Sequence, residues 1–257
     1  MSDPLDVTFF VACLNEERHV AGALDKLAEI GRRLGFSYEI LVFDDCSTDR
    51  TGEVVLAWRR AHPEVRLLLF RNRVNRGLAH NFVEAAFHGR GRFYRLICGD
   101  DTEPVESHLE VMKRMGQADI VLPDYSNAIG KRGLRLILSE AYTMVVNAIS
   151  GNAIRYYNGC ALYRRRDVLR WHVEALGFGF QAELTTRLIH EGRSHVEVKL
   201  VAEHRGESRA LTLRNFLSVA YSLFKIGMRR LSRLVRPAVA AELQEPVEIK
   251  DEPPPKP

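Results

Sequence analysis

Residues 93–104 read Phe93-Tyr94-Arg95-Leu96-Ile97-Cys98-Gly99-Asp100-Asp101-Thr102-Glu103-Pro104. The first six residues are typical of a buried strand, and the proline closes the segment three residues after the second carboxylate. Carboxylates at the carboxyl end of a buried strand lie where open α/β sheets bind their ligands. Their hard oxygens suit Mg²⁺ or Mn²⁺ that holds a phosphorylated substrate. The alternative is an acidic turn that caps the next helix, because Asp and Thr are good N-caps.

The composition is that of an ordinary globular protein. The chain has 257 residues, of which 46% are hydrophobic, which fits one α/β domain with an appendage. The first residues are acidic and lack the basic start of a secretory signal peptide, and no apolar run is long enough to span a bilayer. Four widely spaced cysteines indicate buried free thiols in a reducing compartment. We therefore expect a cytoplasmic protein.

Strand-like and helix-like segments alternate through the first hundred residues. We expect strands at about 7–12, 38–43, 66–70 and 93–98, and helices at about 15–34, 50–62 and 77–88. Asn15 is the expected N-cap of the first helix, and Gly35 is expected to end it. The alternation predicts an α/β fold with a mostly parallel, doubly wound sheet flanked by helices.

Polar clusters follow three of these strands, namely Asn15-Glu16, Asp44-Asp45 and Asp100-Asp101. Right-handed crossovers place the ends of parallel strands on one edge of the sheet, so the clusters predict a nucleotide and metal site there. We expect Asp49 to cap the next helix, and capping is the alternative role for Asp45 and Ser47. The chain has neither the glycine fingerprint of a dinucleotide-binding domain nor a P-loop, which makes both classes unlikely.

Four motifs, in this order, resemble those of the family-2 glycosyltransferases, whose catalytic domain has the Rossmann-like GT-A fold. They are Ala12-Cys13-Leu14-Asn15-Glu16, Asp44-Asp45-Cys46-Ser47-Thr48-Asp49, Asn75-Arg76-Gly77-Leu78-Ala79 and Asp100-Asp101. The resemblance runs from about residue 7 to 210 and implies a catalytic domain over residues 1–211. Segments 180–184, 192–198 and 205–209 look most like those of the polyprenyl-phosphate glycosyltransferases, the group of dolichyl-phosphate mannose synthase.

The resemblance implies a role for each motif. It assigns the nucleotide sugar, linked to GDP or UDP, to Ala12, Leu14, Asn15, Glu16, Asp44, Asp45, Arg76, Gly77 and Asp100. It makes Asp100 and Asp101 the catalytic ligands of Mg²⁺ or Mn²⁺, although Cys98 stands where the family has the first carboxylate of its metal motif, and a thiol is a poor ligand for hard cations. The resemblance assigns the acceptor phosphate to Arg205, Ser208 and Arg209. A hydroxyl acceptor needs a general base, and Glu183 is the available candidate.

The C-terminal part adds a helix and a tail. Residues 212–237 predict a basic amphipathic helix, with an apolar stripe through Phe224, Met228 and Leu231 and basic residues that include Lys225 and Arg229. Such a helix suits an anionic membrane surface; the alternative is a helix packed on the protein's own core with its arginines in water. No aromatic-basic motif indicates nucleic acid. Residues 238–257 lack apolar periodicity, which predicts a disordered tail.

Together these features predict an inverting, metal-dependent glycosyltransferase at the cytoplasmic face of the cell membrane, with a lipid-linked acceptor, most simply polyprenyl phosphate. One alternative keeps the reaction and replaces the acceptor by a sugar or lipid hydroxyl. A second is a non-catalytic module that binds nucleotide sugars and docks on membranes. The sequence does not fix the sugar, the base or the oligomeric state.

Overall fold

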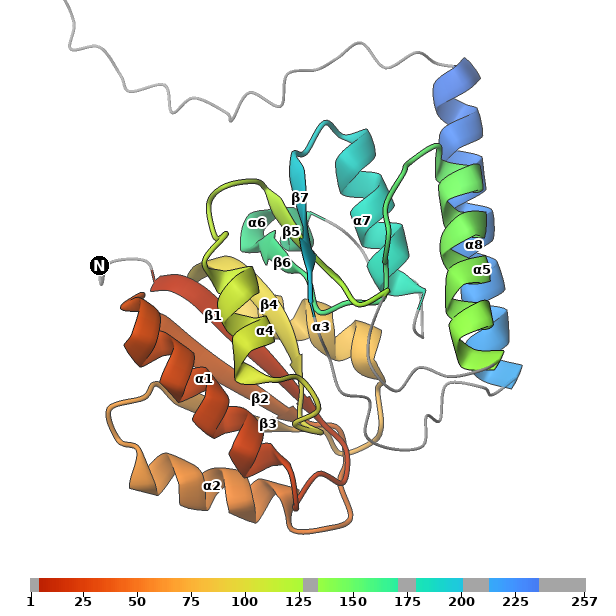
Figure 1. The fold of residues 1–257 in the computed structure, drawn as a ribbon. Coiled ribbons are helices and arrows are strands. Elements are labelled where there is room, and N and C mark those ends of the chain that lie inside the picture. The colour runs from red at the N-terminus through yellow and green to blue at the C-terminus, as the bar shows by residue number, and fades with distance from the viewer. Residues whose placement is uncertain (1–4, 127–133, 171–178, 201–212, 236–257) are drawn as a thin grey trace, which may run out of the picture.

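The computed structural model describes residues 5–126, 134–170, 179–200 and 213–235 (Figure 1). Two sets of predictions lie outside these residues. They are the disordered tail and the acceptor-phosphate residues Arg205, Ser208 and Arg209.

The centre of the molecule is one seven-stranded sheet with the order β3-β2-β1-β4-β6-β5-β7. Its strands are β1 (Leu5–Cys13), β2 (Tyr38–Asp44), β3 (Leu67–Arg71), β4 (Gly91–Cys98), β5 (Ile120–Asp124), β6 (Leu162–Arg164) and β7 (His195–Lys199). β1 pairs in parallel with β2 and β4, and β5 pairs in parallel with β7, whereas β6 is antiparallel to both of its neighbours. The predicted mostly parallel sheet is therefore confirmed.

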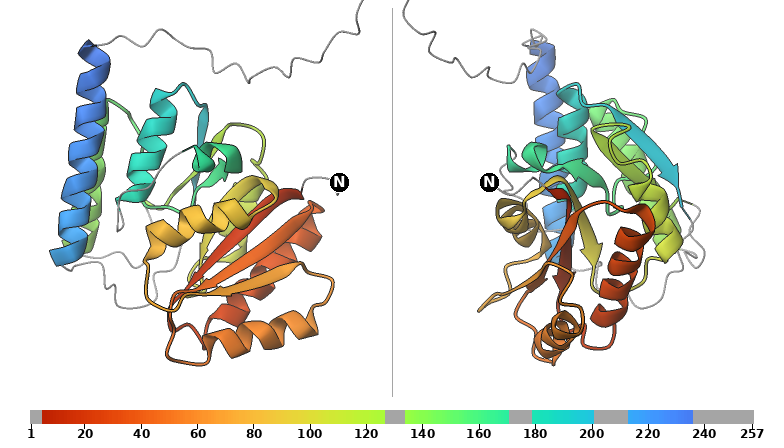
Figure 2. Two further views of the ribbon diagram at one scale, coloured as in Figure 1. Left: turned by 180° about the vertical axis from the view of Figure 1, so that it is seen from behind. Right: turned by 90° about the vertical axis from the view of Figure 1, so that its left-hand side faces the viewer.

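Helices cover both faces of the sheet (Figure 2). They are α1 (Val20–Leu34), α2 (Thr51–Ala61), α3 (Leu78–His88), α4 (Val105–Met112), α5 (Leu134–Ser150), α6 (Arg165–Leu169), α7 (Phe180–His190) and α8 (Leu213–Val235). Alternate residues of a strand point to opposite faces, so Phe9 packs in the core under α1, α2 and α4 while Phe10 packs in the core under α3 and α7. Each face of β1 is thus buried, which explains its run of apolar residues from Phe9 to Cys13.

The first helix begins later than predicted. Asn15 is not its N-cap, because α1 starts at Val20 and Asn15 has a left-handed backbone with a φ of 60°. The side chain of Asn15 instead accepts a hydrogen bond from the Thr48 backbone N–H at 2.8 Å. Gly35 ends the helix as predicted, with a φ of 70° and its N–H bonded to the carbonyl of Gly31.

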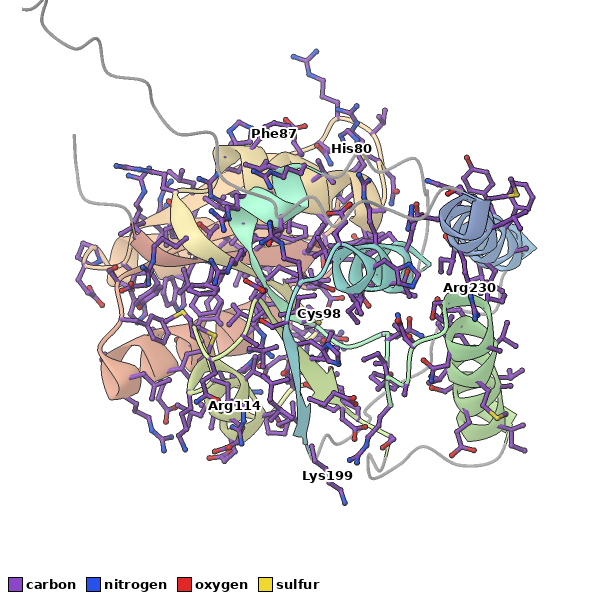
Figure 3. The ribbon with its side chains drawn as sticks, turned by 90° about the horizontal axis from the view of Figure 1, so that it is seen from above. His80, Phe87, Cys98, Arg114, Lys199 and Arg230 are labelled. Atoms are coloured by element: carbon purple, nitrogen blue, oxygen red, sulfur yellow. The ribbon has the colours of Figure 1, made fainter. Side chains whose placement is uncertain are left out.

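Helices α5 and α8 lie side by side beyond α7, at one end of the molecule (Figures 1 and 2). Arg230 of α8 lies between them (Figure 3) and donates to the carbonyl of Ala148 at 2.6 Å. Among the α8 residues whose side chains the structure describes, Ser222 and Ile226 are nearly fully buried. In the described part of the chain, no helix combines the length and the apolar character needed to cross a bilayer.

Candidate functional site

The three polar clusters lie at one edge of the sheet, because their strands are adjacent and parallel. Residue Cys13 of β1 pairs with Asp44 of β2, and Ala12 pairs with Cys98 of β4. The loops that follow these strands therefore leave the sheet at the same level. This placement confirms the expectation that the sequence motifs meet at the carboxyl edge of the sheet.

The loops after β1 and β2 are joined by hydrogen bonds. Ser47 accepts from the backbone N–H of Asn15 at 2.9 Å, and Thr51 accepts from that of Glu16 at 2.8 Å. Leu14, between β1 and these residues, is exposed. In this structure, the backbone N–H groups of Asn15 and Glu16 thus hold the two loops together.

Asp45 organises the loop that precedes α3. Its carboxylate accepts from the side chain of Asn72 at 2.7 Å and from the backbone N–H groups of Arg76 and Gly77 at 2.9 and 2.8 Å. Partial burial acts to raise the pKa of Asp45, but these hydrogen bonds outweigh it, and the pKa lies below its ordinary value. Asp45 is therefore an ionised brace for the Arg76-Gly77 turn.

Asp44 and Asp49 have different partners. Asp44 is nearly fully buried, accepts from the Ser47 N–H at 2.8 Å and lies 3.4 Å from the Arg71 guanidinium. Asp49 accepts from the N–H of Thr51, the first residue of α2, at 2.9 Å. The prediction that Asp49 caps the start of this helix agrees with that contact.

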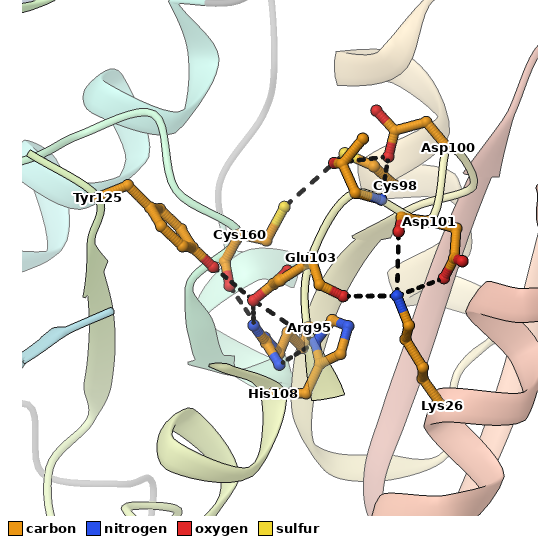
Figure 4. A network of polar contacts seen from close by, with 10 residues as sticks. Lys26, Arg95, Cys98, Asp100, Asp101, Glu103, His108, Tyr125 and Cys160 are labelled. Carbon is orange, nitrogen blue, oxygen red and sulfur yellow. Dashed lines mark hydrogen bonds and ion pairs between the residues drawn. The ribbon is translucent and has the colours of Figure 1, made fainter. Parts of the chain in front are cut away.

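Asp100 and Asp101 point in different directions (Figure 4). Asp101 has a left-handed backbone with a φ of 57°, and its carboxylate forms an ion pair with Lys26 of α1 at 2.8 Å. Asp100 turns the other way, and one of its oxygens, Oδ1, accepts from the Thr102 hydroxyl at 3.0 Å. The structure does not bring the two predicted metal ligands together into one two-carboxylate clamp.

A buried polar network lies next to the loop that carries Asp100 and Asp101 (Figure 4). The fully buried Arg95 of β4 pairs with Glu103, which also accepts from the Tyr125 hydroxyl, and Arg95 donates to His108 at 3.0 Å. Burial acts to raise the pKa of Glu103, but the charge of Arg95, together with the hydrogen bonds from Tyr125 and Arg95, outweighs burial and lowers that pKa. Burial lowers the pKa of His108 to about 4, against the opposing charge of Glu103 and with a further lowering by the charge of Arg95. At neutral pH the network thus holds a charged Arg95, a charged Glu103 and a neutral His108.

None of the sequence motifs indicated this network. Nor did they indicate Lys26, which also donates to the backbone carbonyls of Asp101 and Glu103 at 3.0 Å each. One signal was present in the sequence. Arg95 is the sole charged residue in the run Phe93–Cys98, and a charge inside a buried strand needs a partner.

Asp100 supplies one ligand of the kind that a hard cation needs, but not a complete set. Its second oxygen, Oδ2, accepts no hydrogen bond from any residue that the structure describes, and the side chain is partly exposed. Within the same described residues, however, no group of three or more His, Cys, Asp or Glu side chains converges on a metal position. A Mg²⁺ or Mn²⁺ ion at Asp100 therefore needs further ligands from the substrate diphosphate and water, as is usual for Mg²⁺.

Glu183 lies elsewhere, beneath α8. It is fully buried in the first turn of α7, 2.7 Å from the ammonium of Lys225 and 3.4 Å from the guanidinium of Arg229. Burial lowers the pKa of Arg229, against the opposing effect of the Glu183 charge. Lys225 and Arg229 thus point inward, contrary to an arrangement with these basic groups in water. On the same helix, Phe224, Met228 and Leu231 are exposed.

Comparison with known proteins agrees with this architecture. The family model described as glycosyl transferase family 2 matches residues 8–170. The chain is 31% identical over 114 residues to the dolichyl-phosphate β-glucosyltransferase ALG5C of Trichomonas vaginalis, covering 42% of this chain and 33% of that protein. It is 29% identical over 160 residues to ALG5A of the same organism, covering 56% of this chain and 49% of that protein. The matches thus span between a third and a half of these relatives.

A solved structure shares the fold. The glucosyl-3-phosphoglycerate synthase of Mycobacterium tuberculosis, in complex with Mn²⁺, uridine diphosphate and phosphoglyceric acid, superposes with a TM-score of 0.68. The sequence identity is 15%, and the match covers 87% of this chain and 78% of that one. The fold is therefore GT-A, as the motifs predicted. Because the family model matches well over half of the chain, the chain belongs to glycosyl transferase family 2 and is a glycosyltransferase.

Proposed function

We propose that this glycosyltransferase moves a sugar from a nucleotide sugar to polyprenyl phosphate, with inversion at the anomeric carbon. The observation that carries the proposal is Asp100, a carboxylate with one oxygen that accepts no hydrogen bond from the described residues. The loop that carries it is held by Lys26 and lies at the edge of the sheet where β1 and β2 also end. The dolichyl-phosphate glucosyltransferases among the relatives support the choice of acceptor. Inversion is one in-line displacement, which needs donor and acceptor held on opposite sides of the reacting carbon.

The surroundings of Glu183 favour a phosphate acceptor over a hydroxyl. A general base has to reach the proton that it removes, and Glu183 is buried with Lys225 and Arg229 against its carboxylate. A phosphate acceptor is already ionised near neutral pH and needs no base. Arg205 and Arg209 remain the proposed phosphate ligands, because a guanidinium donates a fork of hydrogen bonds to phosphate oxygens.

The proposed cofactor is Mg²⁺ or Mn²⁺, held by Asp100. When bound, such an ion supplies charge neutralisation for the departing nucleoside diphosphate. Asp44 remains the proposed ligand of the nucleoside. The Arg76-Gly77 turn, whose backbone N–H groups donate to Asp45, lies at the same edge of the sheet. Asp101 contributes by fixing the loop through Lys26.

We further propose that the protein docks on the cytoplasmic face of the cell membrane through the outer sides of α5 and α8. Large apolar side chains are exposed on both helices, with Phe224 64% and Met144 66% exposed. The others are Ile137, Leu138, Val145, Tyr221, Met228 and Leu231. Exposed apolar groups that gather on neighbouring helices are typical of a membrane or protein interaction site. A surface of this kind brings the enzyme to a lipid-linked acceptor.

A transfer assay tests the reaction. The purified chain is incubated with Mn²⁺ and radiolabelled UDP-glucose, UDP-galactose or GDP-mannose, with polyprenyl phosphate as acceptor and the free polyprenol as its matched control. We expect label in the lipid fraction with the phosphate acceptor alone. Label on the polyprenol identifies a hydroxyl acceptor instead. Binding of nucleotide without transfer to either lipid identifies a non-catalytic module and overturns the proposal.

A further inference from the structure

A pair of thiols lies next to the Asp100 loop and has no part in the proposed reaction. The sulfur atoms of Cys98 and Cys160 are 3.9 Å apart, and both cysteines are free. Cys98 is exposed and Cys160 is partly exposed, so solutes reach the pair. Figure 4 shows the two side chains facing each other beside Asp100.

The backbone holds both cysteines in place. Cys98 ends β4 and pairs with Ala12 of β1, and the following N–H, from Gly99, donates to the Ala12 carbonyl at 3.0 Å. On the other side, the carbonyl of Cys160 accepts from the buried Arg95 guanidinium at 3.0 Å. The two sulfurs are therefore brought together by the end of β4 and by the residues just before β6, which is the strand that pairs with β4.

The separation of the sulfurs matches a metal chelate better than a disulfide. In a tetrahedral site with Zn–S bonds of about 2.3 Å, two sulfur ligands lie about 3.8 Å apart. A disulfide requires about 2.0 Å between the same atoms, so its formation would draw the sulfurs together by nearly half of their present separation. Chelation of a thiophilic ion requires almost no movement.

The charge around the pair favours a cation as well. The negative charges of Asp100 and Glu103 act on the Cys98 sulfur. The same charges attract a positive ion to the sulfurs.

We propose that Cys98 and Cys160 form a two-sulfur binding site for a thiophilic divalent cation such as Zn²⁺ or Cd²⁺. Both thiols release their protons to solvent as the two metal–sulfur bonds form, and water completes the coordination. Thiolate ligands select such ions over Mg²⁺ and Mn²⁺. The site is thus distinct in chemistry from the hard-cation site proposed at Asp100, although it lies two residues away, and it does not depend on the protein's being active in transfer.

Cadmium titration of the reduced full chain tests the proposal. Binding is followed by the ultraviolet charge-transfer absorption of cadmium thiolates and by the protons released into weak buffer. We expect one Cd²⁺ per chain with two protons released. Cys98→Ser and Cys160→Ser should each weaken binding by more than about tenfold, since loss of even an outer-shell partner of a metal site costs roughly 10–100-fold. Cys46→Ser, which changes a partly exposed cysteine outside the pair, should bind as the wild type does.

Three results would overturn the site. They are unchanged Cd²⁺ affinity in the Cys98 and Cys160 variants, equal loss in Cys46→Ser, and a mass two hydrogens lower with no cadmium bound, which identifies a disulfide. Thermal unfolding of each variant, followed by circular dichroism, shows that the folded chain is being compared. Because the readout is spectroscopic, absence of glycosyl transfer leaves the result unaffected.

Discussion

Lys26 of α1 forms an ion pair with Asp101, its ammonium 2.8 Å from the carboxylate, and thereby separates Asp101 from its neighbour Asp100. The same ammonium donates to the backbone carbonyls of Asp101 and Glu103. Lys26 thus fixes the direction of the Asp101 carboxylate, whereas the Asp100 carboxylate accepts from the Thr102 hydroxyl. Two adjacent acids in the sequence become one brace and one projecting ligand in the structure.

The first prediction separates these roles. Asp100→Asn, like Asp100→Ala, should lower transfer by at least about 100-fold, since it removes the charge that holds a cation against the diphosphate. Asp101→Asn removes an ion pair and leaves Asp100 in place, so its effect on the rate should be far smaller. Initial rates over a range of Mn²⁺ concentrations measure both. Equal losses in the two variants would show that Asp101 also binds the metal.

The second prediction concerns pH and His108. The pKa of His108 is about 4 in the folded protein, below the ordinary value near 6.5 expected when unfolded. Between these values the unfolded chain binds more protons, so the free energy of unfolding should fall as the pH falls from about 6.5 to 4.5, by up to about 3 kcal/mol. Urea unfolding across this window measures the effect.

The matched variant is His108→Asn. The Asn oxygen can accept the hydrogen bond that Arg95 now donates to the His108 ring, and Asn does not titrate. The pH slope between 6.5 and 4.5 should therefore be shallower in this variant than in the wild type. Identical slopes would mean that His108 is not the proton-binding group, whatever the stability of the variant at neutral pH.

Much of the candidate site could be predicted from the sequence because its signals are local. Strand periodicity and the motifs after β1, β2 and β4 were enough to place Asp44 and Asp100 at one edge of the sheet. Gly35 ends α1 because a left-handed C-cap favours glycine, and that preference is visible in the sequence.

What the sequence did not reveal depends on contacts between distant segments. Lys26 and Asp101 are 75 residues apart, and nothing local marks them as partners. Asn15 looked like an N-cap because its residue type fits that role, but the loop after β2 competes for its side chain through Thr48. The inward direction of Lys225 likewise depends on Glu183, a buried acid in another helix.

The third prediction tests that buried acid. Glu183→Gln removes the carboxylate that Lys225 and Arg229 contact, and breaking a buried ion pair from one side costs about 3–5 kcal/mol. We expect the free energy of unfolding to fall by about that amount. The control is Glu191→Gln, which removes a partly exposed ion pair with Arg187 and should cost less than about 1 kcal/mol. A Glu183→Gln protein of unchanged stability that has lost its activity would instead identify Glu183 as the general base of a hydroxyl-acceptor reaction.

The last prediction concerns the outer sides of α5 and α8. Burial of a large apolar side chain contributes about 1.5–3 kcal/mol, so Phe224→Ser combined with Met228→Ser should weaken vesicle binding by more than about tenfold. Phe87→Ser is the matched control, because Phe87 is 62% exposed on α3, away from both helices. Co-sedimentation with vesicles of neutral lipid, and of neutral lipid with added anionic lipid, measures both variants. If the α8 variant sediments as well as the control in both, the apolar face is not the membrane contact. If binding by the wild type requires anionic lipid, basic residues outside the ion pairs with Glu183 carry the attraction, because Lys225 and Arg229 already face that carboxylate.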